Sequence, residues 1–442
     1  MRPRFSALLL LLSFLVFTSA LAKDNPGELA KDAVSSDPKK SASAIAELRS
    51  LGPAGLQTLL RAHAVEINKH INEPLTLATP EWEHLSMALD AVSQQKNSYL
   101  SGLYWYTDLG EAKAAARRAG KPILSLRLLG NLNEEFSCAN SRFFRTILYS
   151  NAAISQILHE RFVLHWKSVR PAPHVTIDFG DGRKLERTLT GNSIHYILDT
   201  EGHPIEALPG LYGPDAFLRA ILATQKVFAK LKEAGGANPG QGLLSYRRER
   251  IQRLNASWLT DIEKTGGKAP EGLSVIRRAD GTPEALQIAQ LALVKALTET
   301  TMLRALTGAS ESLGKITDEP AWRKIAQLHL ADAELDSRSI GLIWRQTHRV
   351  LTADGSRMTS QAAFENLIEK LQLNVALDTV RNEYLMRTKL YAWLLEDRGR
   401  SDIETFNKKV YSELFLTPAS DPWLGLFTAD TYMALDDGGL VR

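Results

Sequence analysis

The sequence is nearly free of cysteine, since Cys138 is the only one among its 442 residues. An intramolecular disulfide is therefore excluded, and stability must come from burial of apolar side chains, which a hydrophobic content of 44% can supply. The sequence also lacks an excess of one charge, since 53 Lys and Arg residues stand against 50 Asp and Glu residues and the formal net charge is +3. Because dense basic stretches are absent as well, we expect no nucleic-acid partner.

Long apolar runs are absent except near the N-terminus, where the pattern is typical of a secretory signal peptide. Two arginines precede an apolar run over residues 7–16, and Ala20-Leu21-Ala22 has the small residues of a cleavage site. The run is too short to span a bilayer comfortably, which disfavours an uncleaved membrane anchor. We therefore expect residues 1–22 to be removed after Ala22, leaving a periplasmic or secreted protein with no membrane span.

Hydrophobic periodicity divides the remaining sequence into three parts. Residues 23–100 have apolar positions at helical spacing, as around Leu48, which predicts an N-terminal helical segment. Residues 101–232 alternate between predicted strands and helices, which indicates an α/β domain with a central sheet. A linker rich in glycine and alanine then opens a C-terminal all-α domain over residues 233–442.

Individual elements follow from the same patterns. Short apolar runs predict strands, and Gly180-Asp181-Gly182 between two of them predicts a hairpin. The predicted strands lie at residues 122–126, 162–166, 175–179, 185–189, 194–198 and 204–208. Helices are predicted at 108–120, 141–159 and 214–232, and beyond the linker at 241–264, 283–306, 319–336, 339–352, 359–372, 378–397 and 401–414.

Cys138 is the residue whose position most favours chemistry. It begins a Cys-x-x-Ser sequence that ends at Ser141, directly after an apolar strand and at the predicted start of a helix. A helix N-terminus carries partial positive charge, which favours a thiolate, and the Ser141 hydroxyl could hydrogen-bond that thiolate. The alternative is that Cys138 is a small buried apolar residue, since free cysteine is among the most buried residue types.

The order of motifs in residues 101–232 resembles the thioredoxin-like superfamily, in particular secreted members with an extended N-terminal helix. The matching features are a helix at 109–120 leading into a strand opened by Lys121-Pro122, the cysteine motif at 138–141, a helix ending at 158–163, a strand and turn at 196–202, and a helix opened by Gly213-Pro214. The resemblance implies a central mixed sheet with flanking helices and a thiol at Cys138 that takes part in disulfide exchange.

Three departures from the family pattern accompany these matches. The second active cysteine of the family falls at Ser141, so a dithiol–disulfide cycle within the chain is impossible. The loop between strand and motif is longer, with residues 130–136 inserted. The cis-proline that faces the thiol in the family falls at Ser193, where a cis peptide would be costly. We therefore expect an altered substrate-binding edge beside Cys138.

Five further residues are candidates for tuning the thiol or forming that edge: Asn140, Arg142, Asn192, Ser193 and His195. Arg142 places a cation on the motif helix. His195 could approach the thiol as a base for nucleophilic chemistry, unless strand alternation points it to the other face. The histidines His165, His174, His195 and His203 of the α/β domain show no ligand spacing with one another or with Cys138, so we predict no metal and no other cofactor.

Two functional hypotheses follow. In the first, the chain is an exported thioredoxin-like protein whose single thiol acts in intermolecular disulfide exchange or redox sensing in the cell envelope. Cys138 and Ser141 would then be the catalytic pair, and protein thiols or disulfides the partners. In the second, the chain is a redox-inactive thioredoxin-fold scaffold whose helical domains bind an envelope protein partner. Composition does not choose between them, but the accessibility of Cys138 does.

Overall fold

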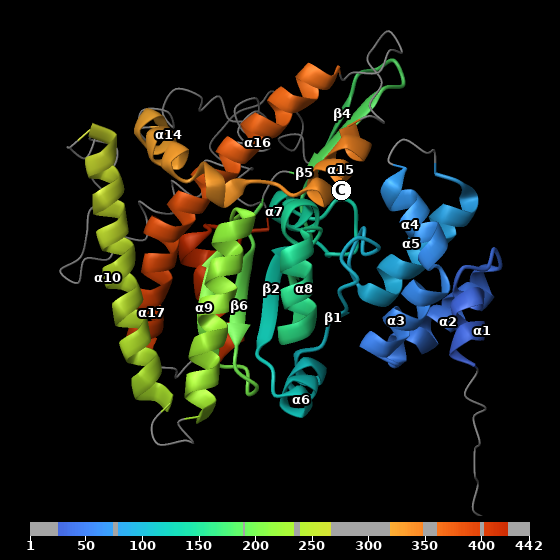
Figure 1. Ribbon diagram of the computed structural model, residues 1–442, viewed down its shortest axis with the longest axis horizontal. Helices are drawn as coiled ribbons and strands as arrows, with labels where there is room; N and C mark the ends of the chain where they lie inside the picture. The colour runs from blue at the N-terminus through green and yellow to red at the C-terminus, as the bar shows by residue number, and fades with distance from the viewer. Residues whose placement is uncertain are drawn as a thin grey trace, which may run out of the picture.

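The computed structural model describes residues 25–73, 78–188, 191–233, 239–266, 319–347, 360–397 and 402–422. At its centre is a mixed five-stranded sheet with flanking helices, set between a group of N-terminal helices and a larger C-terminal helical region (Figure 1). The expected mixed sheet and the expected C-terminal helical region are therefore confirmed. Within the ranges given above, no helix is long and apolar enough to cross a lipid bilayer.

The N-terminal part contains α1 (Pro26–Ala33), α2 (Pro38–Ser50), α3 (Pro53–Ala62), α4 (Ala64–Asn72) and α5 (Pro80–Ser93). Four of these helices have proline in the first turn, where the missing N–H would have had no partner inside the helix. Asn25, Asp37 and Thr79 cap α1, α2 and α5 by accepting hydrogen bonds from backbone N–H groups. The apolar faces meet in a core of their own, which includes Leu48 and Leu89.

The sheet contains β1 (Trp105–Tyr106), β2 (Ile123–Leu129), β3 (Val163–Arg170), β6 (Ile194–Leu198) and β7 (Pro204–Pro209), in the order β1-β3-β2-β6-β7. The central strand β2 pairs parallel with β3 and antiparallel with β6, and β7 pairs antiparallel with β6. β4 (His174–Asp178) and β5 (Lys184–Thr188) form the predicted hairpin, which projects away from the sheet in Figure 1. β1 was not predicted, because two residues are too short to show alternation.

Helices α6 (Leu109–Ala119), α7 (Ala139–Phe143), α8 (Ala152–Arg161) and α9 (Pro214–Glu233) lie between and after the strands. The single helix predicted at 141–159 is wrong, because α7 continues into a π-helical turn, η1 (Phe144–Leu148), and the chain bends before α8. Asn151 explains the break: its side chain accepts a hydrogen bond from the Ile154 N–H and so begins a new helix.

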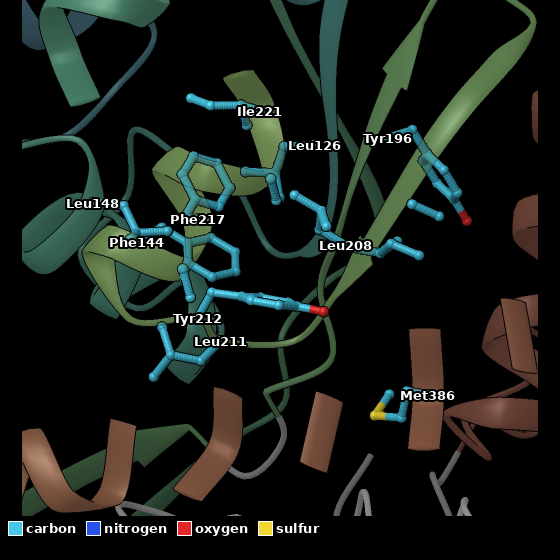
Figure 2. Packing of buried hydrophobic residues seen from close by; sticks show 14 of the residues in the cluster. Leu126, Phe144, Leu148, Tyr196, Leu208, Leu211, Tyr212, Phe217, Ile221 and Met386 are labelled. Atoms are coloured by element: carbon cyan, nitrogen blue, oxygen red, sulfur yellow. The ribbon is translucent and has the colours of Figure 1, made fainter. Parts of the chain in front are cut away.

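Strand alternation divides the side chains of the sheet between two faces. On one face Leu126 of β2 lies opposite His195 of β6, and the His195 ring packs against Phe144 of η1 and Phe217 of α9. Figure 2 shows Leu126, Phe144 and Phe217 on the same side of the strands, with Tyr196 on the other side. The helix that bears the cysteine motif therefore packs on the Leu126 face.

The C-terminal region contains α10 (Pro239–Gly266), α14 (Glu319–Leu328), the 3₁₀ turn η3 (Leu330–Ala333), α15 (Ser337–Thr347), α16 (Gln361–Arg381), the π turn η4 (Asn382–Arg387), α17 (Thr388–Asp397), α18 (Ile403–Lys409) and the π turn η5 (Val410–Leu414). The predicted gap between helices at 359–372 and 378–397 is wrong. The intervening residues include no Gly or Pro, and Val375, Ala376 and Leu377 are fully buried, so the helix continues. The helix predicted at 283–306 lies outside the described residues.

The second face of the sheet packs against α18 of the C-terminal region. Arg127 of β2 donates a hydrogen bond to Glu404 at 2.9 Å, and Tyr196 of β6 donates to Asn407 at 3.1 Å. Arg127 is fully buried, whereas Glu404 is partly exposed and also pairs with Lys167 at 3.1 Å. A buried cation in the central strand is thus neutralised by a residue far along the chain.

Glu206 of β7 forms a second buried attachment between the sheet and the C-terminal helices. Its carboxylate accepts hydrogen bonds from Arg387 at 2.8 Å, Tyr246 at 2.9 Å and Tyr391 at 2.5 Å. Burial would raise the pKa of Glu206, but the Arg387 guanidinium holds that pKa below its usual value. One hydrophobic cluster runs from the sheet into these helices, so the two parts share a core.

Candidate functional site

Cys138 is the N-cap residue of α7, after the loop that follows β2. Its backbone N–H donates to the carbonyl oxygen of Leu129 at 3.1 Å, which ties the start of α7 to the end of β2. The side chain has no exposed area and belongs to the hydrophobic cluster of the sheet. The thiol therefore lies at a helix start, as the sequence predicts, and is fully buried there.

Serine hydroxyls surround the sulfur. The Sγ of Cys138 lies 3.4 Å from the Oγ of Ser141 and 3.1 Å from the Oγ of Ser193. The Ser141 Oγ is itself 2.7 Å from the Cys138 carbonyl oxygen and 2.7 Å from the Oγ of Ser137. A carbonyl oxygen can only accept, so the Ser141 hydroxyl donates to it and its oxygen accepts from the thiol S–H. The structure thus brings two predicted residues, Ser141 and Ser193, to the sulfur as hydrogen-bond partners.

The loop that contains Ser193 lies directly before β6. No cis peptide bond occurs in the part of the chain that the structure describes, and Ser193 presents a hydroxyl where the resemblance places a proline ring. The Ser193 carbonyl oxygen accepts a hydrogen bond from the N–H of Gly210 at 2.8 Å. The loop is therefore held from one side by the turn that follows β7.

Residues 410–417, which we call the C-terminal cover, pack on the other side of this loop. Asn192 donates to the carbonyl oxygen of Phe415 at 3.1 Å and to the Oγ1 of Thr417 at 3.2 Å. The hydroxyl of Tyr411 donates to the carbonyl oxygen of Asn192 at 3.1 Å, and all four residues are buried. The substrate-binding edge expected beside Cys138 is therefore occupied by the C-terminal part of the same chain.

His195 makes its hydrogen bond elsewhere. Its Nε2 lies 2.6 Å from the hydroxyl of Tyr149, and its Nδ1 has no partner among the described residues. Burial lowers the pKa of His195 to about 3, so the imidazole is neutral at pH 7. The geometry pairs His195 with Tyr149, a residue that the sequence pattern did not single out. This hydrogen bond to Tyr149 gives no support to a nucleophilic pair of Cys138 and His195.

The two remaining candidates lie on α7 itself. Asn140 is buried, and its Nδ2 has no hydrogen-bond partner within the described segments. Arg142 is only partly buried, and its guanidinium donates to the Oγ1 of Thr188 at 2.9 Å. Arg142 also lines a cleft of about 1010 Å³.

Among the residues placed by the structure, no group of three or more His, Cys, Asp or Glu side chains could hold a metal ion. The Nδ1 of His165 lies 2.8 Å from the Oγ of Ser125, and burial lowers the pKa of His165 to about 3. His174 and His203 lie at the surface, each beside one carboxylate.

Sequence reasoning did not single out the buried charges of the sheet, Arg127 and Glu206. A signal was present, since each stands between apolar residues in a run that forms a fully buried strand. A charge at such a position requires a buried partner. The partners, Glu404 and Arg387, lie 277 and 181 residues away along the chain, which no local pattern reveals.

A cleft of about 1010 Å³ lies between α4 and α5, the α7–η1 segment, and α15 and α16. We call it the three-part cleft, because the N-terminal helices, the α/β part and the C-terminal region each contribute a wall. Its lining residues come from separate segments of the sequence, so no local pattern indicates the cleft.

Comparison of the chain with protein-family models, with curated proteins and with solved structures gives no significant match.

Proposed function

We propose that this chain is an exported binding protein in which a thioredoxin-like α/β unit serves as a scaffold and Cys138 is a buried structural residue. One observation carries the proposal: the sulfur of Cys138 has no exposed area and is enclosed by serine hydroxyls. The loop that contains Asn192 and Ser193 is in turn packed against the C-terminal cover, through hydrogen bonds of Asn192.

The arrangement of the α/β part supports the thioredoxin-like scaffold. The motifs that carry the resemblance lie on successive elements, with α6 leading into β2, Cys138 beginning α7, and β6 and β7 preceding α9. The sheet is mixed, as the resemblance implies. Serine at positions 141 and 193 removes the second thiol and the facing proline, which are the features that belong to the redox site and not to the fold.

The chemistry of disulfide exchange favours the scaffold over a redox enzyme. A thiolate must reach a sulfur atom of the partner disulfide, so an enclosed sulfur must first be uncovered. With no second cysteine in the chain, a mixed disulfide at Cys138 would have no internal thiol to resolve it. A binding scaffold requires neither step.

Export is part of the proposal and rests on the signal-like pattern of residues 1–22. The partner would then be a protein of the cell envelope.

A second function, intermolecular disulfide exchange by Cys138, is favoured by one feature. The sulfur lies at the N-cap of α7, and the hydroxyls of Ser141 and Ser193 could rotate to donate to a thiolate. This function requires the C-terminal cover to move away from the loop at Asn192.

Thiol labelling distinguishes the two functions. The native full chain is treated with iodoacetamide at pH 7.5, and the same reaction is run in concentrated urea as a control. The scaffold proposal expects negligible labelling of Cys138 in the native protein and complete labelling in urea. Rapid native labelling would reject it.

Partner capture adds a functional readout. The full chain and its Cys138→Ala variant are used as bait in an envelope extract, with and without dithiothreitol. We expect both baits to recover the same partner, and dithiothreitol to leave the recovery unchanged. Recovery that depends on Cys138, or that dithiothreitol abolishes, would favour disulfide exchange.

A further inference from the structure

The three-part cleft has the size of a ligand site. Its volume of about 1010 Å³ is at the upper end of the range of about 300–1,000 Å³ typical of small-molecule sites. One face of α16 lines it through Leu367, Lys370 and Asn374, which helical spacing places on the same side. A cleft of this size accommodates a peptide segment better than a single inorganic anion.

The charge of the lining is predominantly positive. The cationic side chains that line the cleft are Lys96, Arg142, Arg145, Arg345 and Lys370, and the carboxylates are Glu83 and Glu135. Lys96 is neutralised by Asp90 at 3.2 Å. The excess of positive charge therefore comes from the arginines and from Lys370.

Two of these arginines are buried and hydrogen-bond to neutral oxygen atoms. Arg145 is 4% exposed and donates to three backbone carbonyl oxygens at 2.6 to 3.3 Å. Arg345 is 7% exposed and donates to the hydroxyl of Tyr99 at 2.9 Å and to a backbone carbonyl at 3.3 Å. The Nε atoms of both have no hydrogen-bond partner in the described ranges. The carboxylates of Glu135 and Asp90 favour the charged form of Arg145, but its side chain donates its hydrogen bonds to carbonyl oxygens. A ligand carboxylate that hydrogen-bonds to either guanidinium would stabilise it further.

Burial does not remove this positive charge. Burial lowers the pKa of Arg145 to about 10, so its guanidinium stays protonated at neutral pH.

Apolar and aromatic side chains also line the cleft, beside uncharged polar ones. His70 stacks on Trp82 with ring centroids 3.6 Å apart, and Tyr99 meets Trp82 edge-on at 5.2 Å. Met87 on α5 and Leu367 on α16 are exposed although both are large and apolar. Exposed apolar side chains beside buried cations indicate a ligand that is both apolar and anionic.

We propose that the three-part cleft binds an acidic peptide segment that also carries apolar side chains, contributed by a partner protein. This inference rests on the proposed binding function and specifies where and by what chemistry the partner binds. The carboxylates of the segment pair with Arg145, Arg345 and Lys370, and its apolar side chains pack on Trp82 and Leu367. Arginine suits this role because its planar fork binds a carboxylate through two parallel hydrogen bonds.

A single-stranded nucleic acid is the competing ligand, since it is also anionic and stacks on aromatic rings. The lining carboxylates Glu83 and Glu135 disfavour a continuous phosphate backbone. The small net charge of +3 also provides little long-range attraction for a polyanion. The acidic peptide is therefore the better match.

The test measures binding to the full chain by fluorescence anisotropy. The probe is a short, end-capped, fluorescein-labelled peptide of glutamate and leucine, and its matched control replaces every glutamate with glutamine. We expect the glutamate peptide to bind with an affinity that falls as salt rises, and the glutamine peptide to bind at least about tenfold more weakly.

Variants locate the binding in the cleft. Arg345→Met is expected to weaken binding at least about tenfold, because it removes a buried cation that the peptide pairs with. Lys370→Glu and Leu367→Glu change exposed side chains, so they keep the fold, and each is expected to weaken binding at least about fivefold. The matched control is Lys230→Glu, an equal charge reversal on α9 outside the cleft lining, with unchanged affinity.

Several outcomes would overturn the inference. Equal binding of the glutamate and glutamine peptides would exclude charge recognition, and full affinity of Lys370→Glu and Leu367→Glu would place binding elsewhere. Displacement of the peptide by an oligonucleotide that binds more tightly would favour nucleic acid. None of these results depends on thiol chemistry, so rapid labelling of native Cys138 would reject the proposed scaffold function separately.

Discussion

The Oγ of Ser193 lies 3.1 Å from the Sγ of Cys138, joining the loop before β6 to the N-cap residue of α7. Both side chains are fully buried. The contact places a hydroxyl, which can donate or accept, at the point where the thioredoxin-like resemblance expects a proline ring. The sulfur is thus part of a small buried polar cluster, so a substitution of Cys138 changes both the packing and the hydrogen bonding of that cluster.

Substitution of Cys138 by serine and by valine separates these two contributions. Cys138→Ser keeps a hydrogen-bonding group beside Ser141 and Ser193, so we expect the free energy of unfolding to change by less than about 1 kcal/mol. Cys138→Val leaves those hydroxyls without the sulfur and is expected to cost about 1–3 kcal/mol. Urea denaturation of both variants measures the difference. A valine variant as stable as the serine variant would show that the hydroxyl cluster does not depend on the sulfur.

Removal of Tyr411 tests whether the C-terminal cover shields the thiol. Tyr411→Ala deletes a buried ring whose hydroxyl holds Asn192, and we expect the rate of iodoacetamide labelling of Cys138 to rise at least about tenfold. Tyr391→Ala is the matched control, because it deletes an equally buried tyrosine that bonds to Glu206. Similar labelling rates in the two variants would mean that labelling reports global destabilisation. That result would contradict the statement that the C-terminal cover shields Cys138.

Stability should fall as pH drops below the ordinary histidine pKa. Burial lowers the pKa values of His165 and His195 to about 3, whereas an unfolded chain has histidine pKa values of about 6.5. Between about pH 3 and pH 6.5 the unfolded state binds more protons than the folded state. The stabilisation that comes from keeping these two histidines neutral is therefore complete above about pH 6.5 and is lost as pH falls toward 3. His329 acts in the opposite sense, because its hydrogen bond to Asp332 raises its pKa.

The variant His195→Gln isolates one of these contributions. We expect the free energy of unfolding, measured in urea between pH 7.5 and 4.5, to depend less steeply on pH, by at most about 1.4 kcal/mol per pH unit for one proton. His159→Gln, at an exposed histidine, is the control. If His195→Gln retains the full pH dependence of the parent, the buried ring does not contribute to it.

The ion pair between Arg127 and Glu404 should respond unequally to removal of its two members. Glu404→Gln leaves the fully buried Arg127 without its carboxylate and is expected to cost about 2–4 kcal/mol, less than for a pair buried on both sides because Glu404 is partly exposed. Arg127→Met removes the buried charge and leaves Glu404 to pair with Lys167, so we expect a smaller loss. Urea denaturation of the two variants checks the order, and a larger loss for Arg127→Met would contradict this account.

The sequence predicted most of the local structure because local structure leaves periodic signals. Apolar runs located β2, β3, β6 and β7, and Gly180-Asp181-Gly182 located the β4–β5 hairpin. The signal was weaker at boundaries, as at Asn151, whose capping role ends one helix and begins another. The cysteine motif was likewise placed at a helix start from local pattern alone.

The surroundings of Cys138 could not be predicted in the same way. The sequence identified Ser141 and Ser193, which lie on the strand–helix motif and on the turn before β6. It did not identify the contact of Asn192 with Phe415, which joins residues 223 apart. Nothing in the periodicity of residues 401–414 indicates which surface the helix they form will cover.

The sequence by itself determined the single thiol, the absence of a resolving cysteine, and the alternation of strands and helices around it. Only the tertiary structure decided that the thiol is enclosed and that the three-part cleft has buried cations in its wall. The physical reason is that strand and helix patterns report how each segment divides its own polar and apolar side chains. Burial and charge pairing depend on which distant segments pack together, and that is settled only when the shared core forms.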